Sequence, residues 1–168
     1  FTLKEHFGEL RGLKLAFVGD GNNVAHSLML TATRLGVNFA LATPPSFGPN
    51  ADVVRQAGAL TADSGATLRI THDPREAVAG AHGVYTDVWT SMGHETEADQ
   101  RREVFRAYQV NEKLFARAAP EAVFMHCLPA KRGEEVTAEV IECPRSVVFD
   151  QAENRLHTQK ALLLMLLD

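Results

Sequence analysis

Hydrophobic positions along the 168-residue chain follow two alternating patterns. Short runs rich in β-branched and aromatic residues predict buried strands, and apolar residues spaced three or four apart predict amphipathic helices. The predicted strands cover residues 13–19, 39–43, 67–70, 84–87, 122–127 and 147–150. The predicted helices cover 23–35, 51–60, about 101–117, about 134–141 and about 153–167.

This alternation indicates an α/β fold with a doubly wound, mostly parallel sheet and helices on both faces, a Rossmann-like arrangement. A chain of 168 residues, 45% of them hydrophobic, can bury a full core and has the usual size of a single domain. In such sheets ligands bind beyond the carboxyl ends of the strands. We therefore expect functional residues directly after strands.

The turn after the first predicted strand, 19–23, contains two glycines and two asparagines. It resembles a dinucleotide-binding fingerprint, but Val24 replaces the third glycine and no acid follows about 20 residues later. Dinucleotide binding is therefore disfavoured. The helix start and the carboxamides of Asn22 and Asn23 suit a small carboxylate. Alternatively, one asparagine only caps the helix.

Asp87 follows the fourth predicted strand and opens a loop that contains Trp89, Ser91 and Met92. An ammonium group can pair with Asp87, while Ser91 and Met92 supply backbone groups and an adaptable apolar wall for a methylene chain. In the alternative interpretation Asp87 caps a turn and Trp89 fills the core.

Cys127 and His126 end the fifth predicted strand. Such a thiol can be a low-pKa nucleophile, a metal ligand, a polar group whose thiolate attracts an amine, or an inert buried side chain. No second cysteine or histidine stands at ligand spacing, which disfavours a metal site.

Arg155 follows the sixth predicted strand, where a guanidinium can bind a phosphate or carboxylate, or pair with Glu153. Residues 161–167 are apolar on every side of the last predicted helix. Seven residues are too few to cross a bilayer, which needs about 20, so we expect another protein surface to cover them.

The composition narrows the possible partners. A net charge of −4, from 17 basic and 21 acidic residues, provides no basic stripe for nucleic acid. The two cysteines do not form the pattern of a secreted disulfide scaffold, and no signal peptide or membrane-spanning run is evident. We expect a soluble cytoplasmic protein. The start at Phe1, within the end of a helix, leads us to expect a longer parent protein.

Four runs, 19–23, 87–93, 126–129 and 153–160, have the order and spacing found in ornithine carbamoyltransferases. Over essentially its whole length, the chain resembles the carboxyl-terminal, ornithine-binding domain of that family. Aspartate carbamoyltransferases share the architecture but lack the second and third of these runs. The resemblance implies transfer of a carbamoyl group from carbamoyl phosphate to the side-chain amine of L-ornithine, giving L-citrulline in arginine biosynthesis, without a cofactor or metal.

The resemblance also assigns the ornithine residues. It implies that Asn23, Asp87, Ser91 and Met92 hold the amino-acid end of ornithine, with the α-ammonium at Asp87.

By the same resemblance, Cys127, Leu128 and Arg155 face carbamoyl phosphate, and Cys127 and Asp87 are the catalytic residues. The amine attacks the carbonyl carbon directly, so no covalent enzyme intermediate is implied.

Two phosphate-binding runs of the family's first domain, Ser-Thr-Arg-Thr-Arg and His-Pro-x-Gln, do not occur in this sequence. We therefore expect residues 1–8 to end a linking helix, 9–168 to form the ornithine-binding domain, and the last helix to pack on an amino-terminal domain. The chain is expected to be inactive alone, and the full-length family member to form a homotrimer. The alternatives are a carbamoyltransferase for putrescine or an acylated ornithine, which Asp87 disfavours, and a noncatalytic amino-acid-binding module.

Overall fold

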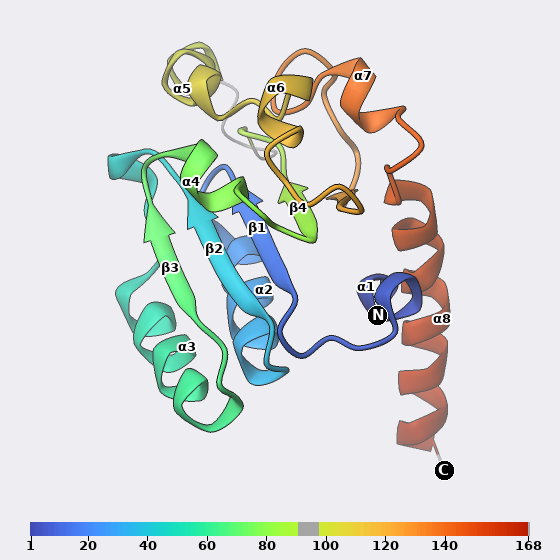
Figure 1. The fold of residues 1–168 in the computed structure, drawn as a ribbon. Helices are drawn as coiled ribbons and strands as arrows, with labels where there is room; N and C mark the ends of the chain where they lie inside the picture. Colours follow the sequence, from blue (N-terminus) through green and yellow to red (C-terminus); the bar gives the residue numbers. More distant parts are fainter. Residues whose placement is uncertain (91–97, 168) are drawn as a thin grey trace.

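A parallel sheet of five strands forms the centre of the chain (Figure 1). The structure is a computed structural model that describes residues 1–90 and 98–167. The strands are β1 (Lys14–Val18), β2 (Asn38–Ala42), β3 (Leu68–Thr71), β4 (Gly83–Thr86) and β5 (Val123–His126). Their order is β3-β2-β1-β4-β5, and every pairing is parallel. The predicted doubly wound α/β fold is confirmed.

Both faces of the sheet are buried along β1, β2, β4 and β5, whereas the edge strand β3 is partly exposed. In β1, Ala16 and Val18 belong to one core cluster, whereas Leu15 and Phe17 belong to the cluster on the opposite face. Side chains alternate across a strand, so a strand covered on both sides carries apolar residues at every position. This explains why the first two strands appear in the sequence as continuous apolar runs.

The helices cover the two faces unequally. The long helices α2 and α3 lie against each other on one face, and short α4 lies on the other (Figure 1). The helices are α1 (Thr2–Phe7), α2 (Asn23–Arg34), α3 (Ala51–Ser64), α4 (Pro74–Val78), α5 (Ala98–Phe105), α6 (Glu112–Phe115), α7 (Ala138–Ile141) and α8 (Val148–Leu167), with 3-10 turns η1 (Pro45–Phe47) and η3 (Arg106–Tyr108).

The first and last helices meet through buried Asn154 of α8. Its amide donates hydrogen bonds to Thr2 Oγ1 at 3.0 Å and to Glu5 Oε2 at 2.5 Å, both on α1. Beyond this contact α8 runs free of the sheet, and the side chains of 162–167 are 56–81% exposed. No helix within 1–90 and 98–167 has the length and apolar character needed to cross a membrane. The predicted boundary between 1–8 and 9–168 stays a prediction.

The predicted sixth strand at 147–150 is wrong. Phe124 of β5 pairs with Ser146 only in an isolated bridge, and α8 begins at Val148. The backbone amide of Gln151 already donates to the Val147 carbonyl, which is the hydrogen bond of an α-helix. A run of three apolar residues does not distinguish a buried strand from the buried first turn of a helix.

The predicted helix at 101–117 is divided. After α5 and η3, Val110 leaves the helix and forms a parallel bridge with Val136. Asn111 then starts α6, because its side chain accepts a hydrogen bond from the Leu114 amide at 3.0 Å. The same bridge shortens the helix predicted at 134–141 to α7.

Helix α4 was not predicted from the apolar spacing, because it has only five residues. The sequence does carry a start signal: the Asp73 side chain accepts from the Arg75 amide at 2.9 Å, and Pro74 occupies the first helical position.

We expect Asn111→Ala to lower the free energy of unfolding by about 1 kcal/mol, the usual effect of losing a side-chain N-cap. Urea denaturation measures the change, and Asn111→Asp, which keeps a capping oxygen, is the control. Equal losses in the two variants would contradict the capping role.

Candidate functional site

The carboxyl ends of β1, β4 and β5 bring three predicted turns together. These strands are neighbours in the sheet, so Asn22 after β1, Asp87 after β4 and Cys127 after β5 meet at one edge. The strand order reverses between β1 and β4, and the crevice at such a reversal is where ligands bind in open α/β sheets.

Asp87 is the centre of this edge. Its Oδ2 accepts from Asn22 Nδ2 at 3.0 Å, and its Oδ1 accepts from the Val88 amide at 2.8 Å and from Cys127 Sγ at 3.1 Å. One carboxylate therefore links all three turns. The prediction that Asp87 and Cys127 share a site is consistent with this contact, while their roles stay predictions.

The two asparagines of the first turn have different positions. Asn22 caps α2, since its Oδ1 accepts from the Val24 and Ala25 amides at 3.0 and 3.1 Å. Asn23, the predicted ornithine residue, is the exposed first residue of α2. Sequence analysis identified the cap as an alternative but missed the Asn22 bond to Asp87, which depends on a distant turn.

Gly21 allows this turn to lie against the backbone of the loop that contains η1. A Cβ atom there would lie 2.4 Å from the Pro49 nitrogen and 2.6 Å from the Gly48 carbonyl carbon. The Gly21 amide also donates to the Phe47 carbonyl at 2.9 Å. This close backbone approach explains the second glycine of the 19–23 run.

Cys127 is a neutral thiol at physiological pH. Burial, followed by its hydrogen bond to Asp87 and that carboxylate's charge, raises its pKa from 9.0 to about 12. The thiol therefore donates to Asp87, which argues against a low-pKa nucleophile and against the thiolate interpretation. Cys127 and Cys143 are both free.

Tyr85 lies beside Cys127, and Gln151 binds both Tyr85 and the residue before Cys127. Sequence analysis missed both residues. The side-chain Nε2 of Gln151 donates to Tyr85 Oη at 3.0 Å, and its side-chain Oε1 accepts from the backbone amide of His126 at 3.2 Å. Burial and the neighbouring Cys127 raise the pKa of Tyr85. Gln151 reaches this position because α8 starts where a sixth strand was predicted.

Cys127, Leu128 and Arg155, the three residues predicted to face carbamoyl phosphate, line one cavity of about 530 Å³. This volume suits a small ligand. Arg155 does not follow a strand as predicted, because it lies in the second turn of α8. Its proposed partner Glu153 instead pairs with His157 at 3.2 Å.

Arg101 is a further residue that sequence analysis missed. Its guanidinium forms a salt bridge with Asp20 of the first turn and donates from Nε to the Trp89 carbonyl at 2.5 Å. It also lies over the Phe47 ring at 4.7 Å. Trp89 itself is buried, as its alternative interpretation held. Arg101 thereby joins α5 to the turns that carry Asp20 and Asp87.

The two remaining predicted ornithine residues, Ser91 and Met92, lie outside the described residues. Their assignment rests on the sequence.

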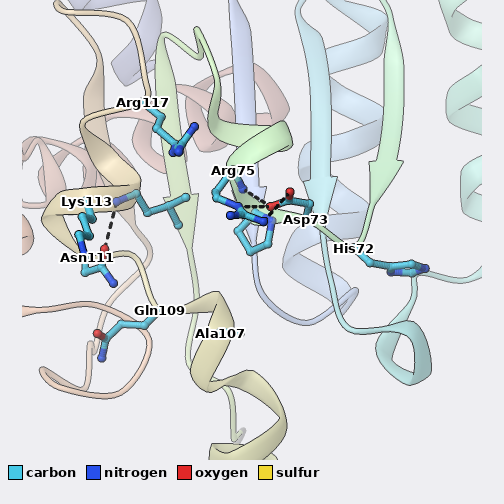
Figure 2. Close-up of a pocket in the computed structure, with 10 residues that line it drawn as sticks. His72, Asp73, Arg75, Ala107, Gln109, Asn111, Lys113 and Arg117 are labelled. Carbon is cyan, nitrogen blue, oxygen red and sulfur yellow. Dashed lines mark hydrogen bonds and ion pairs between the residues drawn. The ribbon is translucent and has the colours of Figure 1, made fainter.

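A second cavity, of about 690 Å³, contains none of the predicted site residues. Figure 2 shows His72, Asp73 and Arg75 on one side of it and Asn111 and Lys113 on the other. Its carboxylate, Asp73, is occupied by Arg75 and by the start of α4. The edge around Asp87 is therefore the better candidate site.

The fold is that of a doubly wound α/β domain, and this edge is a candidate small-molecule site at its switch point. The chain belongs to the aspartate/ornithine carbamoyltransferase family, because residues 11–166 match the family's Asp/Orn binding domain. This confirms the resemblance found in the sequence.

Individual relatives support this family assignment. Ornithine carbamoyltransferase from Thermococcus kodakarensis is 53% identical over 166 residues, which are 99% of this chain and 53% of that protein. The solved ornithine carbamoyltransferase from Pyrococcus furiosus is 54% identical, with a TM-score of 0.93 over 96% of this chain and 52% of that one. A solved N-acetyl-L-ornithine transcarbamylase variant is 34% identical, with a TM-score of 0.83 over 96% of this chain and 52% of that one. The chain thus spans about half the length of these relatives.

We expect alkylation of Cys127 by iodoacetamide to accelerate continuously from about pH 8 to about pH 10, because its raised pKa keeps the reactive thiolate scarce throughout this range. Asp87→Asn removes an acceptor and a negative charge, so it should lower the pKa of Cys127 and speed its alkylation at the lower pH. Mass spectrometry of the Cys127 peptide measures both rates.

Asp63→Asn, the same substitution at an exposed position of α3, serves as the control and should leave the profile unchanged. A wild-type rate that levels off by about pH 10 would show an ordinary thiol pKa of about 8.5 and contradict the assigned neutral state.

Proposed function

We propose that this chain is the ornithine-binding part of an ornithine carbamoyltransferase. The complete enzyme transfers the carbamoyl group of carbamoyl phosphate to the side-chain amine of L-ornithine and releases L-citrulline and phosphate. Family membership supports the reaction class, and the contact between Asp87 and Cys127, at 3.1 Å, is the observation that carries the assignment to this edge.

The ornithine side of the site follows from charge. Asp87 is half-buried and already orders three donors, so an α-ammonium that replaces one of them gains a charge-assisted hydrogen bond. Asn23, at the amino-terminal end of α2, supplies a carboxamide and the helix-end amides suit a carboxylate. Ser91 and Met92 complete this proposal from the sequence alone.

The carbamoyl side follows from the cavity. Arg155 supplies positive charge for the phosphate group. The Leu128 amide donates to His126 Nδ1 at 2.8 Å. Among the described residues, no protein group donates to the carbonyl oxygen of Leu128. That carbonyl is suited to accept a hydrogen bond from the carbamoyl amide.

The neutral Cys127 thiol is a hydrogen-bond donor beside the reacting atoms and forms no bond to carbon. The deprotonated amine attacks the carbonyl carbon, a carbon–nitrogen bond forms, and the carbon–oxygen bond to phosphate breaks. The nitrogen then loses its proton to solvent or to phosphate. Orientation of the two substrates and stabilisation of the developing oxyanion account for the acceleration.

We propose a second, amino-terminal domain in the complete enzyme. The relatives are about twice as long, and the phosphate-binding runs expected of that domain do not occur here. The exposed apolar side chains of 162–167 are suited to pack on it. A homotrimer of the complete chain in the cytoplasm is the corresponding assembly, and two free cysteines agree with a reducing compartment.

Acylated ornithine is the strongest competing substrate, since an N-acetyl-L-ornithine transcarbamylase shares the fold. Its acylated nitrogen carries no charge for Asp87 to bind, whereas putrescine lacks the carboxylate. Assays of the complete enzyme with the three amines distinguish them. Preference for acetylornithine or putrescine over ornithine would overturn the substrate assignment.

In the complete enzyme, Asp87→Asn should lower kcat/KM for ornithine by about a hundredfold, since losing one partner of a desolvated charge pair costs roughly 2–5 kcal/mol. Citrulline formation measures the change, and Asp63→Asn on exposed α3 is the matched control. Residues 1–168 alone should make no citrulline. Turnover by these residues at the rate of the complete enzyme would contradict the need for a second domain.

A further inference from the structure

Two ionisable side chains, His126 and Glu135, lie buried together close to the Cys127–Leu128 wall of the 530 Å³ cavity. His126 at the end of β5 and Glu135 before α7 have no exposed side-chain surface, and His126 Nε2 lies 3.3 Å from Glu135 Oε1. Among the described residues, His126 Nε2 and Glu135 Oε2 have no hydrogen-bond partner of good geometry. Buried polar atoms left in this state are costly, so their presence requires a reason.

The hydrogen bonds of His126 fix its proton. Its Nδ1 accepts from the Leu128 amide at 2.8 Å, so this nitrogen carries no hydrogen. The imidazole is therefore neutral with its hydrogen on Nε2, the atom that faces Glu135. The negative charge of Glu135, 3.3 Å from Nε2, favours this same tautomer, as carboxylates beside histidines do at other sites.

Glu135 holds the other end of the same loop. Its Oε1 accepts from the Lys131 amide at 2.6 Å. Leu128, whose own amide is the first of the two held amides, has the left-handed backbone angle φ of 57°, which is rare for a residue other than glycine. Leu128 and Cys127 both line the cavity assigned to the carbamoyl group.

We infer that Glu135 and His126 are positioning residues: the buried pair orients the backbone of Cys127 and Leu128 toward carbamoyl phosphate. This inference rests on the proposed function. Neither side chain touches substrate, and both act through the loop between them. An apolar pair of similar volume would fill this interior without the cost of burying a carboxylate, so packing alone does not account for the two residues.

Kinetics of the complete enzyme separate positioning from stability. Glu135→Met should lower kcat/KM for carbamoyl phosphate by about tenfold to a hundredfold, the effect of a displacement of roughly 1 Å at a reacting group. Both kcat and the KM for carbamoyl phosphate should change, whereas the KM for ornithine should not. Glu135→Gln keeps an acceptor for Lys131 and His126 and should retain most of the activity.

His126→Asn tests the link between the two residues. An asparagine can still accept from the amide two positions later, but it is too short to reach Glu135. It should reproduce the kinetic change of Glu135→Met, and the double variant should be no worse than Glu135→Met, because the two residues act through one contact. This variant also decides the matter if Glu135→Met fails to fold.

Val78→Ala is the control, since Val78 is buried in the core cluster that contains Val136, the neighbour of Glu135, but lies on α4. A variant that is merely less stable loses active enzyme, which lowers kcat and leaves each KM unchanged. Such a result for Glu135→Met and His126→Asn would overturn the inference.

Hydrogen–deuterium exchange supplies a readout that does not depend on activity. Glu135→Met should accelerate exchange in the peptide that spans 127–135, and Val78→Ala should not. Equal protection in both variants would contradict the inference. A wild-type enzyme that forms no citrulline would instead contradict the proposed function, while the exchange result would still report on the loop.

Discussion

The pairing of β4 with both β1 and β5 is the constraint on which the site depends. Because all three strands are parallel, their carboxyl ends lie at one edge and deliver three separate turns to one place. Asp87 can then accept hydrogen bonds from Asn22 and Cys127, which are 65 and 40 positions away in the chain. Any shift in the register of β4 would separate these groups.

Burial then determines what these groups can do. The same low-polarity surroundings that hold Cys127 against Asp87 raise the pKa of the thiol to about 12. The site therefore offers hydrogen-bond donors and a carboxylate, and its thiol is not a ready nucleophile. This chemistry is suited to orienting two substrates for direct reaction with each other.

Most of the sheet could be predicted from the sequence, because strands buried on both faces appear as uninterrupted apolar runs. The sixth strand could not be excluded in this way, since Val147, Val148 and Phe149 would fit a strand or a helix. For the same reason Arg155 was placed after a strand. The break at Asn111 depends on a bridge between Val110 and Val136, which local spacing does not reveal.

The candidate site shows a similar division. Asp87, Cys127 and Arg155 were singled out because they follow predicted strands, and Leu128 was assigned by the family resemblance alone. Gln151, Arg101 and Glu135 were missed, because each acts on a residue distant in the sequence or through a side chain hidden in the interior. Contacts of this kind need the folded chain before they become visible.

Helix α8 connects two regions that look unrelated in the sequence. Its first turns carry Gln151 and Arg155, and its last turns carry exposed apolar side chains at 162–167, about 10–18 Å from Arg155 at the rise of an α-helix. An α-helix resists bending over this length, so under the proposed packing of the leucines on a second domain, that domain also sets the direction in which Arg155 points. Contacts at the carboxyl-terminal end of α8 therefore influence how Arg155, near its other end, is oriented toward the cavity.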